Sequence, residues 1–315
     1  MTTFILRRTA GFLATVMAIS IVVFFVMNVL PGDPAAVILG LDASEEAIAA
    51  LRTELGLDRP VWQRYFAWVG ALLTGDLGES YFFRIPVSEL IAERIPLTLA
   101  LAAIGMFGTV IVGVALGIMA AARHGRAGDW AIMLFSQAGI AVPAFWLSIL
   151  LVLLFAVWLR WLPPGGFPGF DEPLQALRSL ILPATALALV QAAVLARVTR
   201  SSALDVMKLD FIRTAQSKGL SQWGILRYHV LPNALIPVVT IIGLQVAAVV
   251  TGTIVIENVF YLPGLGRLIF QSIANRDLFV VQALVVFFAF IVVAANFIVD
   301  IAYVVIDPRL RDRLE

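Results

Sequence analysis

Cysteine is absent from this 315-residue sequence, and charged residues are scarce. Without cysteine the chain has no disulfide and no thiolate ligand for a metal ion. Only 14% of its residues are charged, whereas soluble domains carry roughly 25%. Hydrophobic residues make up 61%, and the mean hydropathy is +0.97. This composition excludes an ordinary soluble fold and predicts that lipid surrounds much of the chain.

Sequence motifs of enzymes are also missing. The two histidines, His124 and His229, share no metal-binding spacing, and there is no His-Glu-x-x-His, Gly-x-Ser-x-Gly or phosphate-binding loop. The formal net charge is +1 and no basic stripe is interleaved with aromatic residues, which argues against nucleic acid as a partner. We therefore expect no enzyme, no metal site and no cofactor in this chain. Any ATP and Mg must be bound by another chain.

Apolar stretches long enough to cross a bilayer, which takes ~20 helical residues, occur six times. They cover residues 9–30, 97–122, 130–159, 180–196, 234–256 and 278–305. The first follows Arg7 and Arg8 as a signal peptide would. It is longer than a signal core, however, and it ends in Pro-Gly-Asp-Pro instead of a cleavage site. The sequence predicts an all-α polytopic membrane protein with six transmembrane helices and an uncleaved first helix.

Positive charge gathers on one side of these predicted spans. That side holds Arg7, Arg8, Arg123, Arg126, the arginines between residues 197 and 227, Arg309, Arg311 and Arg313. The opposite side holds the acid-rich segment 31–96. Because Lys and Arg concentrate in cytoplasmic flanks, both termini are predicted to be cytoplasmic, and the even number of spans agrees.

The segment 31–96 is too long for a simple turn and carries helix signals. Ser44 is placed to cap a helix that begins at Glu45 and ends near Gly56, and a second helix is expected over residues 61–73. We predict an ordered helical insert outside the cytoplasm. Within the second span, Gly113-x-x-x-Gly117 offers a close helix-packing face. Whether that face serves dimerisation stays open, since small residues are common in membrane helices.

The connection 199–233 is the most informative part of the sequence. It predicts a helix over 206–218, a stop at Gly219, and a second short helix capped by Ser221 and carrying Trp223. A helix–glycine–helix element has the form of a docking surface on the cytoplasmic face. An amphipathic hairpin lying on the inner leaflet is the alternative, and physical reasoning alone leaves both open.

This connection resembles the coupling element of ABC-importer permeases. The family pattern runs Glu-Ala-Ala, three residues, Gly, nine residues and Ile-x-Leu-Pro. In this chain it falls on Arg213-Thr214-Ala215, Gly219 and His229-x-Leu231-Pro232. Arg213 and His229 depart from the general pattern, but they fit the peptide-transporter branch, which resembles the run from Asp210 to Leu220.

The resemblance extends over essentially the whole chain, to the dipeptide/oligopeptide permease family of the first-subunit type with a long outer loop. Its landmarks, in chain order, are Leu30-Pro31-Gly32-Asp33-Pro34, Leu55-Gly56-Leu57-Asp58-Arg59-Pro60, Gly75-Asp76-Leu77-Gly78-x-Ser80, Arg94-Ile95-Pro96-x-Thr98-Leu99, Pro143-x-Phe145-Trp146, Leu162-Pro163-Pro164-Gly165-Gly166, Arg197-x-x-Arg200-Ser201-Ser202, Glu257-x-Val259-Phe260-x-x-Pro263-Gly264-x-Gly266 and Asp300-x-x-Tyr303-x-x-x-Asp307-Pro308-Arg309. No single motif is specific, but their order is.

The resemblance implies one half of a heterodimeric permease pair in the bacterial inner membrane, importing peptides or related small solutes. Two cytoplasmic ATPases and an extracytoplasmic solute-binding protein are the other implied partners. The residues implied in ATPase coupling are Asp210, Arg213, Thr214, Ala215, Lys218, Gly219, Leu220, Trp223 and Arg227.

The segment 257–277 resembles the family's loop that closes the outer mouth and meets the binding protein. The residues expected there are Glu257, Phe260, Tyr261, Pro263 and Gly264. It is apolar but too short to span, so it is expected to be interfacial or re-entrant and packed on protein. A plain interfacial amphipathic segment is the alternative.

Polar residues inside the predicted spans are candidates for the translocation path. They are Ser136, Gln137, Gln191, Gln245, Thr251 and Asn296. Hydrogen bonding between helices is the competing role for each of them. The alternative function from another class is a secondary carrier or channel that works without ATP. The sequence places no carboxylate at mid-span, which argues against an ion-coupled carrier.

Overall fold

The computed structural model describes residues 2–29, 34–40, 43–54 and 56–306. These residues form helices, and no strand occurs among them. The helices are α1 (Thr2–Val29), α2 (Pro34–Leu39), α3 (Glu45–Glu54), α4 (Val61–Thr74), α5 (Val87–Ala122), α6 (Ala127–Ala141), α7 (Ala144–Leu151), α8 (Pro173–Met207), α9 (Asp210–Ser217), α10 (Gln222–Ile225), α11 (Leu231–Val259), α12 (Leu265–Ala274) and α13 (Leu278–Ile306), with π-helical turns η1 (Val152–Trp158) and η2 (Leu226–Val230). Arg309, Arg311, Arg313 and residues 30–33 lie outside the described residues.

Five helical runs are long and apolar enough to cross a membrane, and a bent pair brings the number to six among the described residues. The bent pair covers the predicted span 130–159, which is therefore broken and not one straight helix. α6 and the α7–η1 run meet at an angle of 108°. Pro143 causes the break because it lacks a backbone N–H and forces Val142 into an extended conformation. α6 alone has 15 residues and is about 22 Å long at 1.5 Å per residue, too short to span a bilayer.

Several spans are longer than their apolar stretches suggested, α5 and α8 among them. α5 begins at Val87, so the insert predicted over 31–96 ends at Pro86, and Pro96 lies inside the helix. α8 covers residues 173–207, whereas the apolar stretch covered only 180–196. An apolar stretch in the sequence ends where charged residues begin, but the helical hydrogen bonding of the backbone continues through those charged flanks.

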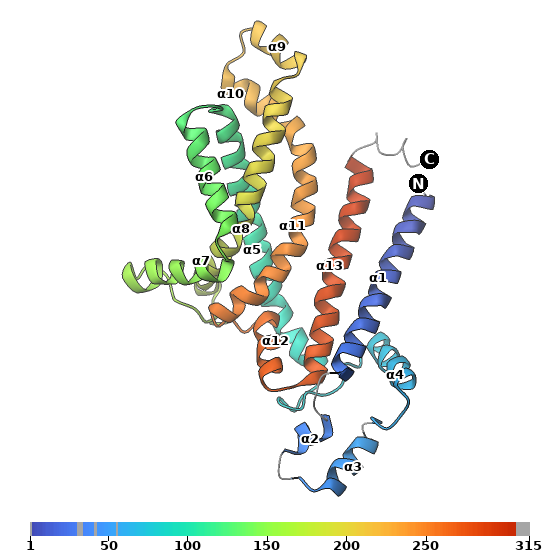
Figure 1. Ribbon diagram of the computed structural model, residues 1–315. Coiled ribbons are helices and arrows are strands. Elements are labelled where there is room, and N and C mark those ends of the chain that lie inside the picture. Colours follow the sequence, from blue (N-terminus) through green and yellow to red (C-terminus); the bar gives the residue numbers. More distant parts are fainter. Residues whose placement is uncertain (1, 30–33, 41–42, 55, 307–315) are drawn as a thin grey trace.

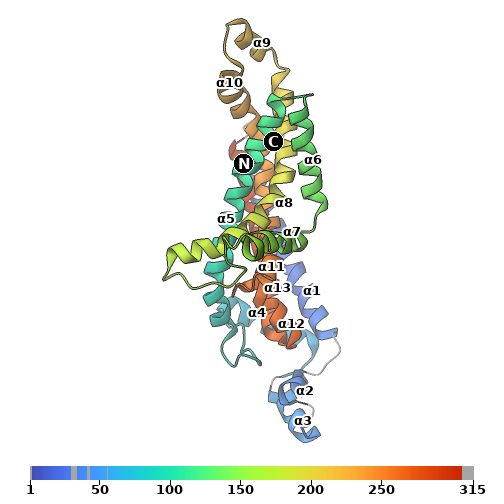
Figure 2. The ribbon, with the colours of Figure 1, turned by 90° about the vertical axis from the view of Figure 1, so that its left-hand side faces the viewer.

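The elements form an elongated bundle with different short helices at its two ends (Figures 1 and 2). α9 and α10 lie at one end, which we call the inner end after the predicted orientation. α2 and α3 lie at the opposite, outer end. α7 projects sideways from the bundle (Figure 1). In the outer insert, Ser44 accepts a hydrogen bond from the Ala47 N–H at 3.2 Å and caps α3, as predicted.

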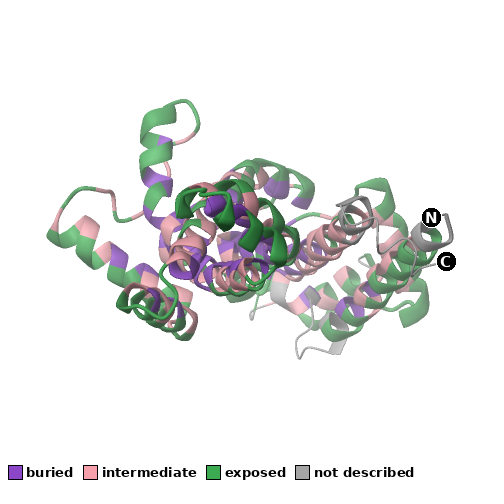
Figure 3. Ribbon diagram, turned by 90° about the horizontal axis from the view of Figure 1, so that it is seen from above, coloured by how far each residue is buried: buried purple, intermediate pink, exposed green. Residues whose placement is uncertain are grey.

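α5 and α8 run parallel in the centre of the bundle and touch through small residues. A methyl group at Gly113 would lie 2.8 Å from the Leu195 Cβ, and one at Gly117 would lie 2.5 Å from the Thr199 Cβ. Gly113-x-x-x-Gly117 therefore packs within the chain. α8 is the most enclosed span, because 67% of the residues in its apolar stretch are buried. The corresponding share is 17% for α1, which lies along α13. Buried residues accordingly gather in the central helices (Figure 3).

We predict that Gly117→Ala destabilises the protein by about 1–3 kcal/mol, the usual cost of overpacking. The added methyl group would also lie 2.7 Å from the Ala196 carbonyl oxygen, which is backbone and cannot move aside. The melting midpoint in mild detergent measures the effect. Gly70→Ala on α4 is the matched control because no atom lies within 4 Å of its added methyl group. Equal midpoints for the two variants would contradict the packing argument.

Candidate functional site

The inner end carries the helix–glycine–helix element that the sequence predicts. Gly219 has a φ of +76° and separates α9 from α10. The Ser221 hydroxyl accepts a hydrogen bond from the Gly224 N–H at 3.2 Å and caps α10. Both local predictions are confirmed. The element begins later than the predicted residue 199, because α8 continues to Met207 and Thr199 is buried within it.

An apolar cluster fixes this element to the bundle, and we call it the inner cluster. Its buried members are Ala121 of α5, Ala203 and Val206 of α8, Ile212 and Ala215 of α9, Ile225 of α10, Leu226 and Val230 of η2 and Ala234 of α11. The Ser202 hydroxyl also donates to the Ala234 carbonyl at 2.9 Å and ties α8 to α11. The element is therefore held by three long helices at once.

The outward side of the element is apolar with a charged rim. Trp223 is 66% exposed and Leu220 is 46% exposed. Of the predicted coupling residues, Ala215 is buried, and the exposed ones are Asp210, Arg213, Thr214, Lys218, Gly219, Leu220, Trp223 and Arg227. Leu209, Phe211 and Tyr228 add further exposed apolar surface that the sequence reasoning did not single out. Exposed aromatic and aliphatic side chains on a rigid base are typical of a protein-binding surface.

At the outer end, α11 turns into α12 through residues 260–264, and Glu257 lies beneath this turn. Glu257 is fully buried. It accepts hydrogen bonds from the Thr98 hydroxyl at 2.6 Å, from the Gly266 N–H at 2.6 Å and from the Arg267 N–H at 3.3 Å. Phe260 and Gly264 are also buried, whereas Tyr261 and Pro263 are exposed. Of the five predicted outer residues, only Tyr261 and Pro263 offer side-chain surface to a partner here.

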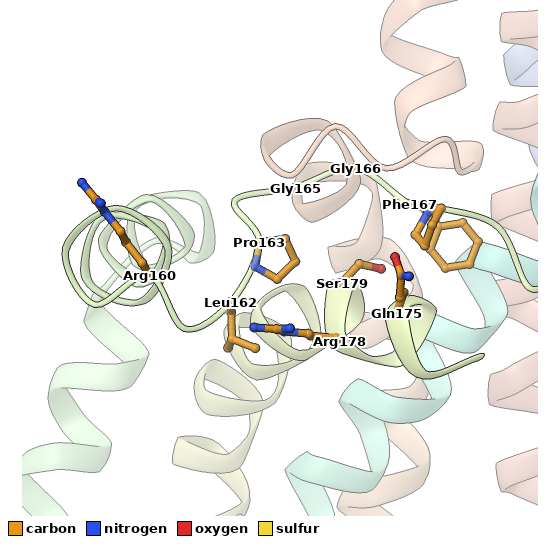
Figure 4. A pocket seen from close by; sticks show the side chains of 10 residues that line it. Arg160, Leu162, Pro163, Gly165, Gly166, Phe167, Gln175, Arg178 and Ser179 are labelled. Carbon is orange, nitrogen blue, oxygen red and sulfur yellow. The ribbon is translucent and has the colours of Figure 1, made fainter. Parts of the chain in front are cut away.

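The loop between η1 and α8 lies beside this outer turn. The Gly166 N–H donates to the Phe260 carbonyl at 2.8 Å, and Gly165 approaches that carbonyl too closely to carry a side chain. A cavity of about 740 Å³ lies between residues 160–168 and the first turns of α8. Gln175, Arg178 and Ser179 face the loop there, and Arg160 points away (Figure 4). A second hollow, of about 500 Å³, reaches Tyr261.

The polar residues inside the spans divide into different environments. Gln245 of α11 donates to the Gln191 carbonyl of α8 at 2.9 Å, while its own side-chain oxygen has no partner among the described residues. Ser136 of α6 is also buried without a partner for its hydroxyl in the described part of the chain. Gln137 and Thr251 are exposed and Asn296 is half-buried. The structure thus brings Gln191 and Gln245 together, between two helices.

Comparison with known proteins identifies the family. The family model for the binding-protein-dependent transport system inner membrane component matches residues 113–312, and the model for the N-terminal part of such components matches residues 1–102. The chain belongs to this family. It is the permease subunit of an ABC importer and a multi-pass protein of the bacterial inner membrane.

Relatives of the permease align over nearly its whole length. A putative peptide transport system permease of Brucella abortus (strain 2308) is 46% identical over 312 residues, covering 99% of each chain. A glutathione transport system permease of Salmonella choleraesuis is 40% identical over 311 residues, again covering 99% of each. A crystal structure of an amino acid ABC transporter shares the fold, with a TM-score of 0.50, 15% identity and coverage of 69% of the permease and 94% of that chain.

A partly buried ion pair near the inner end of the permease was not predicted. Asp129 of α6 accepts two hydrogen bonds from the Arg200 guanidinium of α8, at 2.6 and 2.7 Å. The His124 ring nitrogen lies 3.2 Å from the Asp129 carboxylate, and the Gly125 N–H donates to it at 3.0 Å. The only sequence signal is an acidic residue directly before an apolar run. Its partner is 71 residues away, so the sequence did not reveal the pair.

We predict that Asp129→Asn destabilises the permease by roughly 2 kcal/mol, because hydrogen bonds to charged groups are the stronger ones and Arg200 loses its counter-charge. The melting midpoint in detergent measures the loss. Asp205→Asn is the matched control, since Asp205 pairs with Lys208 in the open, with side chains 69% and 74% exposed. Exposed pairs contribute about 0–1 kcal/mol. A larger effect from the control would contradict the assignment.

Proposed function

We propose that this permease forms half of the translocation path of an ATP-driven importer for peptides or related small solutes, glutathione included. The relatives named for peptide and glutathione transport support this solute class. The importer would also contain a second permease, two cytoplasmic ATPases and an extracytoplasmic solute-binding protein. The ATPases would bind ATP and Mg and carry out hydrolysis, while this chain performs no catalysis.

The α9–α10 element is the proposed docking site for an ATPase. The observation that carries this proposal is the pairing of an exposed Trp223 with the buried inner cluster beneath it. Trp223 and Leu220 would fill an apolar groove of the ATPase, and Arg213 and Arg227 would make charged contacts at its rim. Because the inner cluster joins α5, α8 and α11, a displacement of the docked element would move these spans as a body.

Orientation follows from the same proposal. The α9–α10 element, Arg123 and Arg126 would face the cytoplasm, as the distribution of Lys and Arg predicts. The α2–α4 insert, Tyr261 and Pro263 would face the other side, where the solute-binding protein delivers its cargo.

We expect Trp223→Ala to weaken ATPase binding about 30-fold, since truncating an anchor residue costs ~2 kcal/mol or more. The measurement is co-purification of ATPases and the second permease with the tagged chain from mild detergent. Trp62→Ala is the matched control, because Trp62 is 62% exposed but lies on α4 at the outer end. The ATPases should be lost with Trp223→Ala and retained with Trp62→Ala.

Two outcomes count against the proposal. Retention of the ATPases by Trp223→Ala would show that they dock elsewhere. If the chain purifies alone and transports solute after reconstitution without ATP, it works as a secondary carrier or channel instead.

We further predict that some of Ser136, Gln137, Gln191, Gln245, Thr251 and Asn296 line the path. With no native cysteine, single Cys substitutions are clean probes. In the assembled importer, Thr251→Cys and Gln137→Cys should react with a charged, water-soluble thiol reagent at rates that change with ATP. Met17→Cys, mid-way along the peripheral α1 and exposed on its surface, should not react. The path assignment is wrong if none of the six positions reacts in any transport state.

A further inference from the structure

The buried Glu257 joins α12 to two spans instead of facing a partner. Its hydrogen-bond partners among the described residues are uncharged groups: the Thr98 hydroxyl of α5 and two backbone N–H groups at the start of α12. The Arg267 guanidinium turns away and donates to the Tyr261 carbonyl at 2.8 Å. A buried carboxylate is tolerated only while its hydrogen bonds are kept, so these contacts hold one another in place.

The first turn of α12 is capped from outside its own helix. The Leu265 N–H donates to the Thr98 hydroxyl oxygen at 3.0 Å, and the next two N–H groups donate to Glu257. N–H groups in the first helical turn have no partner within the helix, and a negative charge is favourable at this end. α5 and α11 together therefore supply the cap that α12 lacks.

Backbone contact makes this junction tight. A methyl group at Gly264 would lie 2.3 Å from the Glu257 carboxylate carbon, and one at Gly266 would lie 2.3 Å from the Ile254 Cα. Residues larger than glycine do not fit at either position without displacing α12 from α11. The outer turn and α12 therefore lie directly on the last turns of α11.

The helix that ends at the outer turn carries the α9–α10 coupling surface near its other end. Residues Gln222–Val259 form one unbroken helical run of 38 residues, which is about 57 Å long. Trp223 lies in its first turn, and Leu226 and Val230 belong to the inner cluster. The ATPase-facing surface and the outer turn are thus the two ends of one element.

We propose that Glu257 is a positioning residue for transport: together with Thr98 it makes α12 and the outer turn move with α11. This role rests on the proposed function, because it transmits a displacement that begins at the docked ATPase. Without the Glu257 contacts, α12 keeps its apolar packing through Leu265 and Leu268. It loses the hydrogen bonds that fix its first turn to α5 and α11, so the outer turn follows α11 less closely.

The test uses the full importer reconstituted in liposomes with its binding protein and ATP. Glu257→Gln keeps the size of the side chain but replaces one acceptor oxygen with an amide NH2 donor, so the side chain can no longer accept from both the Thr98 hydroxyl and the α12 N–H groups. We expect the ratio of solute taken up to ATP hydrolysed to fall at least fivefold, while the ATPases still co-purify. An unchanged ratio overturns the proposal.

Thr98→Val is the second variant, because it removes the hydroxyl while keeping the shape, and Thr98→Ser is the conservative rescue. Hydrogen exchange of the purified chain in detergent gives a readout independent of transport. In Glu257→Gln and Thr98→Val, the amides of residues 265–268 should exchange at least tenfold faster, while those of the first buried turns of α13 stay as protected as in the wild type. Thr98→Ser should restore both protection and the uptake ratio.

Different outcomes count against the proposed function and against the positioning role of Glu257. If the wild type shows no ATP-driven uptake, the proposed function is wrong. If the wild type transports and exchange in α12 quickens without any change in the uptake ratio, Glu257 is structural only and the positioning role is wrong. Unchanged exchange in both variants would show that Glu257 does not hold α12 at all.

Discussion

The parallel contact between α5 and α8 is the constraint on which the remaining packing depends. Lipid tails are as apolar as the side chains of a membrane helix, so helices associate through close packing and polar contacts. Gly113 and Gly117 let α8 approach the α5 backbone directly. α6 and α11 then pack on α8, and the inner cluster is built where α5 and α8 end.

Asp129 and Glu257 are two of the three buried carboxylates among the described residues, and they fasten the bundle where its helices leave the centre. Asp129 binds α6 to α8 near the inner end through Arg200, and Glu257 binds α12 to α5 and α11 at the outer end through Thr98. Both connect segments that are far apart in the sequence. Between them the helices share apolar packing with few charges, which favours motion of the bundle as a body over bending of its parts.

This arrangement explains how exposed and buried residues are divided in the two functional segments. In the inner element, the buried side chains attach it to three spans and leave Trp223 and Leu220 for a partner. In the outer segment, Glu257 and Phe260 attach the turn, while Tyr261 remains accessible. In each segment, one part of a short motif serves attachment and another part offers surface.

The sequence by itself determined the membrane class, the six apolar stretches and the local form of the inner element, including the cap at Ser221. These follow from composition and short-range signals, which act within a few residues. Only the tertiary structure decided the 108° break at Pro143, the extension of α5 and α8 past their apolar cores, and the burial of Glu257. Those depend on which distant groups meet, as Asp129 meets Arg200 across 71 positions. No local sequence pattern predicts such a long-range contact, because its stabilising energy arises only when the helices pack.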